Sequence, residues 1–94
     1  MPRFLVEVSH DPNTAACAHA IEVFLRTGSH FLTHAYWGCM DGEHKAWMTL
    51  ELDSKREALN VVPADYRPHT KIVQLNAFTK GDVDTMHRKL GTQR

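Results

Sequence analysis

The sequence contains few cysteines, no long apolar run and no excess of charge of either sign. Its 94 residues include only Cys17 and Cys39, which do not form a C-x-x-C pair, so we expect small buried side chains rather than a disulfide. No stretch of eighteen apolar residues occurs, which argues against a membrane-spanning helix. Eleven basic residues balance eleven acidic ones, so a broad positive surface for nucleic acid or an anionic membrane is not expected.

Several motifs with known chemistry are also missing. The chain has no glycine-rich phosphate loop, no G-x-S-x-G, no H-E-x-x-H and no H-x-E with P-C-x-x-C. The apolar stretch near the N-terminus is interrupted at Glu7, and it lacks the features of a secretory segment. We therefore expect a cytoplasmic protein without a bound cofactor.

The composition is that of a globular protein with one small core. Hydrophobic residues make up 43% of the chain and charged residues 23%, which argues against a disordered or fibrous protein. A chain of this length is expected to form a single domain over residues 1–94, with 91–94 as a frayed tail. A formal net charge of zero favours self-association.

Hydrophobic periodicity divides the chain into alternating strands and helices. Period-two alternation or β-forming residues predict strands over residues 3–9, 29–38, 44–52 and 70–78. Helical spacing predicts a helix over 12–27 that Gly28 ends, a short helix from Ser54 that Pro63 ends, and a closing helix over 79–90. The dipeptide Asp41-Gly42 predicts a two-residue hairpin turn, which would pair Trp37 with Ala46 and Cys39 with His44.

This order predicts a ferredoxin-like α+β fold, βαββαβ with a four-stranded antiparallel sheet and an extra C-terminal helix. Both main helices would cover one face of the sheet. The other face would carry a semi-polar set: Leu5, Glu7, His30, Leu32, His34, Tyr36, Trp47, Thr49, Ile72, Gln74 and Asn76. Because such a face is better covered by a second sheet than by water, we expect a homodimer packed sheet against sheet.

A resemblance covers residues 46–78. The run A-W-M-T-L-E-L-D-S, a short helix, V-V-P, then Pro68 and K-I-V-Q-L, resembles the second half of the muconolactone isomerases. The same run is similar to small members of the dimeric α/β-barrel superfamily. The resemblance implies a dimeric barrel of two packed sheets, with a small-molecule cavity in each protomer.

Seven histidines are the strongest compositional anomaly. On the predicted strand, His30 and His34 would lie on one face about 13 Å apart, too far to bind one ion together. Across a dimer axis, His34 of each protomer could approach its mate, and neutral imidazole binds zinc, nickel or copper. The alternatives are a ligand-binding role and that of polar interface residues.

Cys39 and His44 are predicted neighbours across the hairpin. They are compatible with a reactive thiol–imidazole pair, with two metal ligands, or with ordinary structural residues. A structural zinc site usually needs four ligands, and no such spacing pattern occurs in the sequence. No metal site is therefore assigned from the sequence.

The remaining candidates are aromatic and polar residues near the predicted hairpin. Trp37, Trp47 and Tyr36 would stack on a flat organic ligand or else belong to the core. Enol or lactone chemistry would use polar groups, with His34 or Glu7 as a proton shuttle. The candidate catalytic residues are therefore His34, Glu7 and Tyr36, and the candidate ligand-binding residues are His30, Trp37, Trp47 and Asn76.

Three functions remain open from the sequence. The first is a small-molecule-binding protein or cofactor-independent isomerase-like enzyme of the dimeric α/β-barrel type. The second is a histidine-rich metal-binding or sensing homodimer that uses His30, His34 and the pair Cys39–His44. The third is a structural or interaction module without catalysis. In all three the expected partner is a second copy of the chain, with a small organic ligand in the first, and neither nucleic acid nor a membrane is expected.

Overall fold

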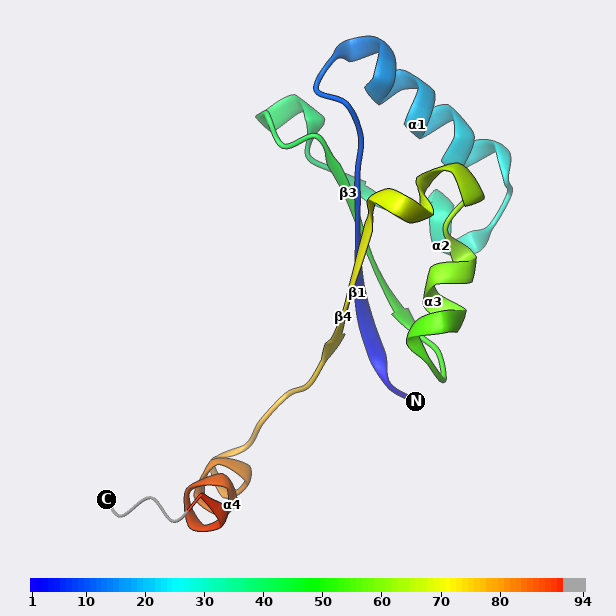
Figure 1. Ribbon diagram of the computed structural model, residues 1–94. Coiled ribbons are helices and arrows are strands. Elements are labelled where there is room, and N and C mark those ends of the chain that lie inside the picture. The colour runs from blue at the N-terminus through cyan, green and yellow to red at the C-terminus, as the bar shows by residue number, and fades with distance from the viewer. Residues whose placement is uncertain (91–94) are drawn as a thin grey trace.

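The computed structural model describes residues 1–90 and has an α+β architecture (Figure 1). Four antiparallel strands form one open sheet in the order β2-β3-β1-β4. The strands are β1 (Arg3–Ser9), β2 (Tyr36–Trp37), β3 (Lys45–Glu51) and β4 (Thr70–Leu75). The α-helices are α1 (Thr14–Arg26), α2 (His30–Thr33), α3 (Lys55–Val61) and α4 (Lys80–Lys89), with short 3-10 turns η1 (Cys39–Asp41) and η2 (Ala64–His69). The predicted fraying of 91–94 lies outside the described residues.

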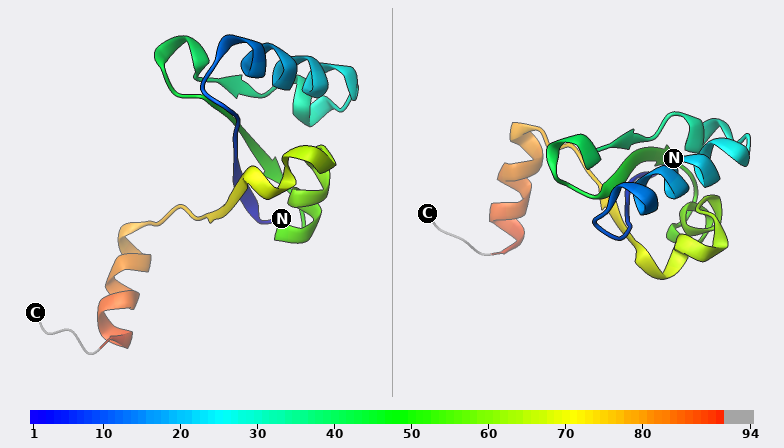
Figure 2. Two further views of the ribbon diagram at one scale, coloured as in Figure 1. Left: turned by 45° about the horizontal axis from the view of Figure 1, so that its top comes forward. Right: turned by 90° about the horizontal axis from the view of Figure 1, so that it is seen from above.

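The core lies between the sheet and the first three helices, which all cover the same side of the sheet (Figure 2). Every second residue of β1 and β3 points into it, as the predicted alternation requires. Buried core residues are Phe4, Val6 and Val8 of β1, Ala46, Met48 and Leu50 of β3, and Phe24, Leu32, Ala58 and Val62 of the helical layer. Burial of these apolar side chains is the main force that holds the helices on the sheet.

Side chains cap the starts of α1 and α3, and α1 begins at Thr14, two residues after the predicted start at residue 12. The Asn13 side chain accepts a hydrogen bond of 2.7 Å from the backbone N–H of Ala16, and Ser54 accepts one of 3.2 Å from Glu57. Gly28 follows α1 with a φ of +72°, a left-handed conformation that glycine adopts without steric cost.

The predicted strand over 29–38 is wrong for most of its length. Residues His30–Thr33 form the short helix α2, and only Tyr36–Trp37 pair as a strand. The β-forming residues of this segment favoured a strand, but a helical turn lets Leu32 reach the core, where it is 2% exposed. Leu32 therefore belongs to the core and not, as expected, to the open face of the sheet.

The connection between β2 and β3 keeps the predicted register but not the predicted turn. Tyr36 pairs with Trp47 and Trp37 with Ala46, as expected. The chain does not turn at two residues, because Gly38–Glu43 form a wider loop around η1. The Gly38 carbonyl accepts backbone hydrogen bonds of 2.9 Å from both Asp41 and Glu43, which closes the loop.

The open face of the sheet differs from the prediction in its contribution from β4. Ile72 pairs with Val6 and Gln74 with Phe4, so both belong to the helix-covered face. Val73 and Leu75 lie on the open face instead, where Val73 pairs with Leu5. The open face therefore has an apolar centre formed by Leu5, Trp47, Val73 and Leu75, with charged residues at its margins.

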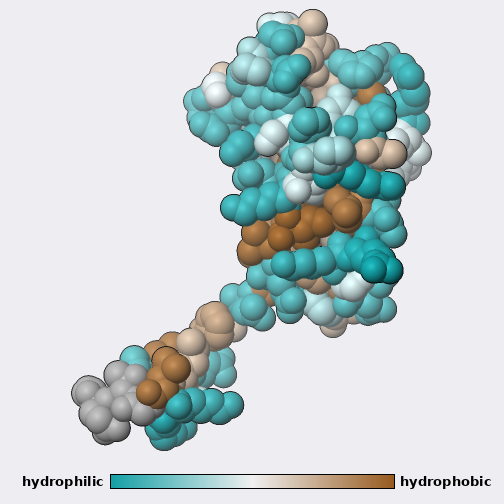
Figure 3. All heavy atoms as spheres, viewed as in Figure 1, coloured by the Kyte–Doolittle hydropathy of each residue, from teal (hydrophilic) through white to brown (hydrophobic). Residues whose placement is uncertain are grey.

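Helix α4 forms as predicted but does not close the fold. It projects from the end of β4 and stands apart from the sheet in all three views (Figures 1 and 2). A capping box between Thr79 and Asp82 begins the helix, and the hydrogen bonds that Asp82 accepts lower the pKa of its carboxyl. Its apolar residues Val83, Met86 and Leu90 are exposed, so the hydrophobic side of α4 lacks a cover among residues 1–90 (Figure 3).

A search of the described residues for a membrane-crossing helix found none with enough length and apolar character.

We expect Gly38 to tolerate no side chain, because the Glu43 backbone and the Trp47 ring lie close to its Cα atom. A Cβ atom would lie 2.7 Å from the Glu43 carbonyl oxygen and 2.7 Å from the Trp47 ring. We predict that Gly38→Ala lowers the free energy of unfolding by about 1–3 kcal/mol, measured by urea denaturation. Gly81→Ala is the control, since its Cβ would have no neighbour closer than 3.7 Å. Equal stability of the two variants would contradict the prediction.

Candidate functional site

A pocket of about 420 Å³ lies where α2 meets the open face of the sheet. Helix α2 provides one wall, while β1, β2 and β3 provide the floor. Its lining residues are Leu5, His30, Phe31, His34, Tyr36, Trp47, Met48 and Thr49. Four sequence-predicted site residues, His30, His34, Tyr36 and Trp47, therefore line one pocket. The mixture of aromatic surface and few polar groups is typical of small-molecule sites.

The two histidines of this pocket lie much closer together than expected. Because α2 is a helix, positions 30 and 34 are one turn apart and share a side, and their ring centroids are 4.3 Å apart. The expected separation of about 13 Å assumed a strand and is wrong. Both residues are exposed, so their imidazoles face the solvent at the rim of the pocket.

A backbone hydrogen bond determines which nitrogen of His34 carries the proton. Its Nδ1 lies 2.8 Å from the carbonyl oxygen of His30. Since a carbonyl oxygen only accepts hydrogen bonds, Nδ1 is the protonated donor and Nε2 of the neutral ring keeps its lone pair. His34 can therefore accept a proton through Nε2 while its ring is held in place through Nδ1.

Glu7 supports the pocket from outside its lining. Its carboxylate accepts a hydrogen bond of 3.1 Å from Nε1 of Trp47 and lies 3.5 Å from Nζ of Lys45. These contacts fix the Trp47 indole, which forms part of the floor. The structure thus gives Glu7 a positioning contact with the pocket rather than direct access to it.

Two other predicted site residues lie elsewhere. Trp37 is half-buried on the helix-covered side, where its ring packs edge-on against Phe24 with centroids 5.0 Å apart. Asn76 follows β4 and lines a separate surface hollow with Arg3 and Glu51. Neither residue is brought to the pocket that contains His34.

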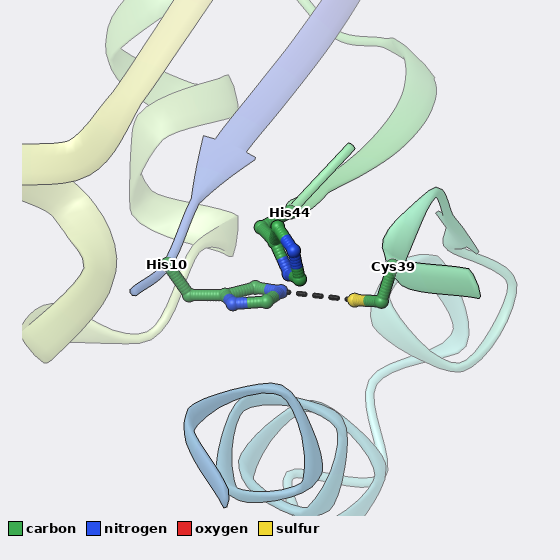
Figure 4. Close-up of side chains that lie close together, drawn as sticks. All are labelled: His10, Cys39 and His44. Carbon is green, nitrogen blue, oxygen red and sulfur yellow. Dashed lines mark hydrogen bonds between the residues drawn. The ribbon is translucent and has the colours of Figure 1, made fainter. Parts of the chain in front are cut away.

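A second group, of histidine and cysteine side chains, lies at one end of the sheet on its helix-covered side. His10 follows β1, Cys39 begins η1 and His44 precedes β3, and one ligand atom from each lies within 4.8 Å of the others (Figure 4). The Nε2 atom of His10 lies 3.1 Å from Sγ of Cys39. Among the buried side-chain nitrogen and oxygen atoms of residues 1–90, only Nδ1 of His44 lacks a hydrogen-bond partner.

The sequence analysis found only part of this cluster. It paired Cys39 with His44, but the predicted first strand ends at residue 9 and leaves His10 outside it. The β1–β3 register could have located His10, because the pair Ser9–Lys45 places the next pair at His10 and His44. A backbone hydrogen bond of 3.1 Å from His10 N–H to the His44 carbonyl extends the ladder to this pair.

The thiol of Cys39 is poorly suited to act as a nucleophile. Burial, with a smaller contribution from the neighbouring Cys17, raises the pKa of Cys39 from 9.0 to about 11. Because the thiolate is the reactive form, a Cys39 with this pKa is almost entirely protonated and unreactive at neutral pH.

Comparison of the chain with family models, curated proteins and solved structures gave no match. Interpretation of the two sites therefore depends on their own geometry.

The raised pKa of Cys39 predicts slow alkylation. In the full chain with a chelator present, Cys39 should react with iodoacetamide about 100-fold more slowly at pH 8 than a thiol with the ordinary pKa of 9.0, with the Cys39 and Cys17 peptides quantified separately. The rate should rise through a midpoint near pH 11, measured by mass spectrometry of quenched samples. A rate that levels off below pH 9 would show that the thiolate is stabilised rather than disfavoured.

Proposed function

We propose that this protein is a homodimer of ferredoxin-like protomers, packed sheet against sheet as a dimeric α/β barrel, that binds a small organic molecule in the pocket beside α2. The strand order β2-β3-β1-β4, with α1 and α3 on one side, supports the fold assignment. The relationship to the muconolactone isomerases, inferred from residues 46–78, is part of this proposal. So is a cytoplasmic location, which the two free cysteines favour.

The open face of the sheet supports the choice of a second copy as partner. Its centre holds Leu5, Val73 and Leu75, with Val73 38% exposed and Leu75 37% exposed. Ion pairs flank this centre, with Arg3 2.6 Å from Glu51 and Lys45 3.5 Å from Glu7. An apolar centre with a polar margin is typical of protein interfaces, and a chain without net charge meets no long-range repulsion from its own copy.

Packing of a second sheet would also change the pocket. Leu5, Tyr36, Trp47 and Thr49 belong to both the open face and the pocket lining. In a face-to-face dimer the partner would cover this open side and remove water from the pocket. Tyr36, which is 79% exposed in the single chain, would then become part of a closed cavity.

The single observation that carries the proposed chemistry is the 2.8 Å contact between Nδ1 of His34 and the His30 carbonyl oxygen, which favours the tautomer with its proton on Nδ1. The Nε2 lone pair of His34 is available at the pocket, and its Nδ1–H is held by the His30 carbonyl. A neutral imidazole with its Nε2 lone pair beside an aromatic floor suits the movement of a proton on a small enol or unsaturated lactone without a cofactor. In this proposal His34 transfers the proton, Tyr36 and His30 contact the ligand, and Glu7 positions Trp47.

The dimer predicts a face-specific effect of added charge. The wild-type chain should sediment as a dimer at micromolar concentration, whereas Val73→Asp should weaken dimerisation more than about 100-fold, because it buries an unpaired carboxylate. Leu25→Asp is the matched control, since Leu25 is also exposed but lies on α1, away from the open face. A monomeric wild-type protein, or equal effects of both variants, would contradict the sheet-to-sheet dimer.

The role of His34 predicts a loss of proton transfer with retention of binding. Small unsaturated lactones and enols would be screened by ligand-observed NMR, and exchange of their α-protons for deuterium would be followed. His34→Gln should slow this exchange by about 10²–10⁴-fold while binding remains. His87→Gln, on the projecting helix α4, should have no effect. Unchanged exchange in His34→Gln would remove His34 from the proposed chemistry.

A further inference from the structure

The cluster of His10, Cys39 and His44 lies away from the α2 pocket and suits a different role. The β1–β3 register brings two of the three residues together, because His10 follows β1 and lies opposite His44, which precedes β3. Alternate residues share a face, so His10 and His44 belong to the side that α1 covers. Cys39 reaches them from η1, the turn that follows β2 (Figure 4).

The hydrogen bonds of His10 direct its lone pair toward Cys39. Its Nδ1 lies 2.9 Å from the Asp11 carbonyl oxygen, which can only accept, so Nδ1 carries the proton. The neutral ring then accepts the S–H hydrogen of Cys39 at Nε2, over 3.1 Å. A single proton thus lies between two atoms that are both good ligands for a transition metal. A carbonyl held by Nδ1–H is also the usual outer support of a metal-binding histidine.

His44 provides an independent sign that a ligand belongs here. Its Nδ1 is buried and makes no hydrogen bond, an arrangement that is destabilising in an ordinary core. Figure 4 shows its ring directed at the hydrogen bond between His10 and Cys39. A bound ion would use a lone pair that the protein itself leaves without a partner.

We infer that His10, Cys39 and His44 bind one zinc-class metal ion, and that Cys17 of α1, which is not one of the three residues whose ligand atoms lie within 4.8 Å, turns toward them to supply the fourth ligand. Cys17 lies beside Cys39 and lines a pocket of about 360 Å³ with Cys39 and His44. Two thiolates and two imidazoles form a Cys₂His₂ set, which suits Zn²⁺ and excludes the hard ions Mg²⁺ and Ca²⁺. The four ligands come from four separate segments of the chain, so the sequence contains no compact metal-binding motif for this site.

The distances require only a small adjustment on binding. With Zn–N near 2.0–2.1 Å and Zn–S near 2.3 Å, ligand atoms of a tetrahedral site are roughly 3.3–3.8 Å apart. The ligand atoms of His10, Cys39 and His44 lie within 4.8 Å of one another. The two most widely separated atoms must therefore approach each other by at most roughly 1.5 Å when the ion binds. Side-chain rotation at these half-buried positions supplies such a movement. Binding releases the Cys39 proton, so affinity should fall as the pH is lowered.

The test is titration of the reduced, chelator-treated full chain with Co²⁺, followed by displacement with Zn²⁺. We expect one Co²⁺ per chain, with thiolate-to-metal charge-transfer absorption and the intense visible bands of a tetrahedral ion. Cys39→Ser and His44→Gln should each weaken binding more than about 100-fold, beyond the loss caused by an outer-shell partner. Cys17→Ser should reduce the charge-transfer intensity, because one thiolate is lost.

Two controls separate this site from other histidines. The double variant His30→Ala/His34→Ala removes the exposed pair on α2, and His87→Gln removes a histidine of α4; both should bind Co²⁺ as the wild type does. Loss of binding in the double variant with retention in Cys39→Ser would overturn the inference. Absence of any Co²⁺ or Zn²⁺ binding by the reduced wild type would overturn it as well.

A measurement on the wild type alone avoids dependence on variants that fail to fold. X-ray absorption of the zinc-loaded protein should show two sulfur and two nitrogen neighbours at the distances given above. A shell of only nitrogen and oxygen would contradict a site at Cys17 and Cys39. Because this readout reports the ligands and not activity, its failure would leave the proposed function of the α2 pocket untouched.

Discussion

Strand β1 is hydrogen-bonded on both edges, to β3 and to β4, and this double pairing determines where the other important side chains lie. The register with β3 places Phe4, Val6 and Val8 opposite the buried residues of β3 and creates the core. The same register places Leu5 and Glu7 on the opposite side, with Thr49 and Trp47. A shift of one residue would exchange the two faces and bury Glu7 beneath α1, so core packing and register enforce each other.

The two candidate sites are separated by the sheet. The pocket with His34 lies on the open side, and the His10–Cys39–His44 cluster lies under α1 at one end. The proposed roles differ accordingly. The exposed histidine pair suits a ligand that enters and leaves, whereas the half-buried thiol and imidazole groups suit an ion that stays bound. In these proposals the metal fixes the strand ends and the loop around η1, whereas the shape of the α2 pocket can change with its ligand.

The sequence predicted the elements whose local pattern and tertiary position agree. The alternation of β1 and β3, the helix start at Ser54 and the stop at Gly28 all follow from local chemistry. Helix α2 could not be predicted in this way, since four residues are too few for a helical period and burial of Leu32 outweighs their β propensity. In β4 both sides of the strand are partly apolar, so only pairing with Val6 shows that Ile72 faces inward.

The site residues also divide into those that the sequence predicted and those that only the tertiary structure brings together. His30, His34, Tyr36 and Trp47 share a pocket even though α2 is not a strand, because one helical turn still brings the two histidines to the sheet margin. His10 was missed because it follows an apparent strand end, and the backbone bond that continues the ladder is not visible in residue types. The proposed use of Cys17 as a fourth ligand depends on the crossing of α1 over the strand ends, which is a tertiary feature.

Helix α4 differs from the rest of the chain in what maintains it. Its ten residues are fewer than the 12–15 or so that an isolated helix needs to persist in water, and the capping box at Thr79 offsets only part of this deficit. Its amide protons should therefore exchange through local opening, far faster than those of β1, which exchange only when the sheet unfolds. The residues 76–79 that join it to β4 are the natural point of proteolytic cleavage, and a cut there would release α4 while the sheet and its core stay folded.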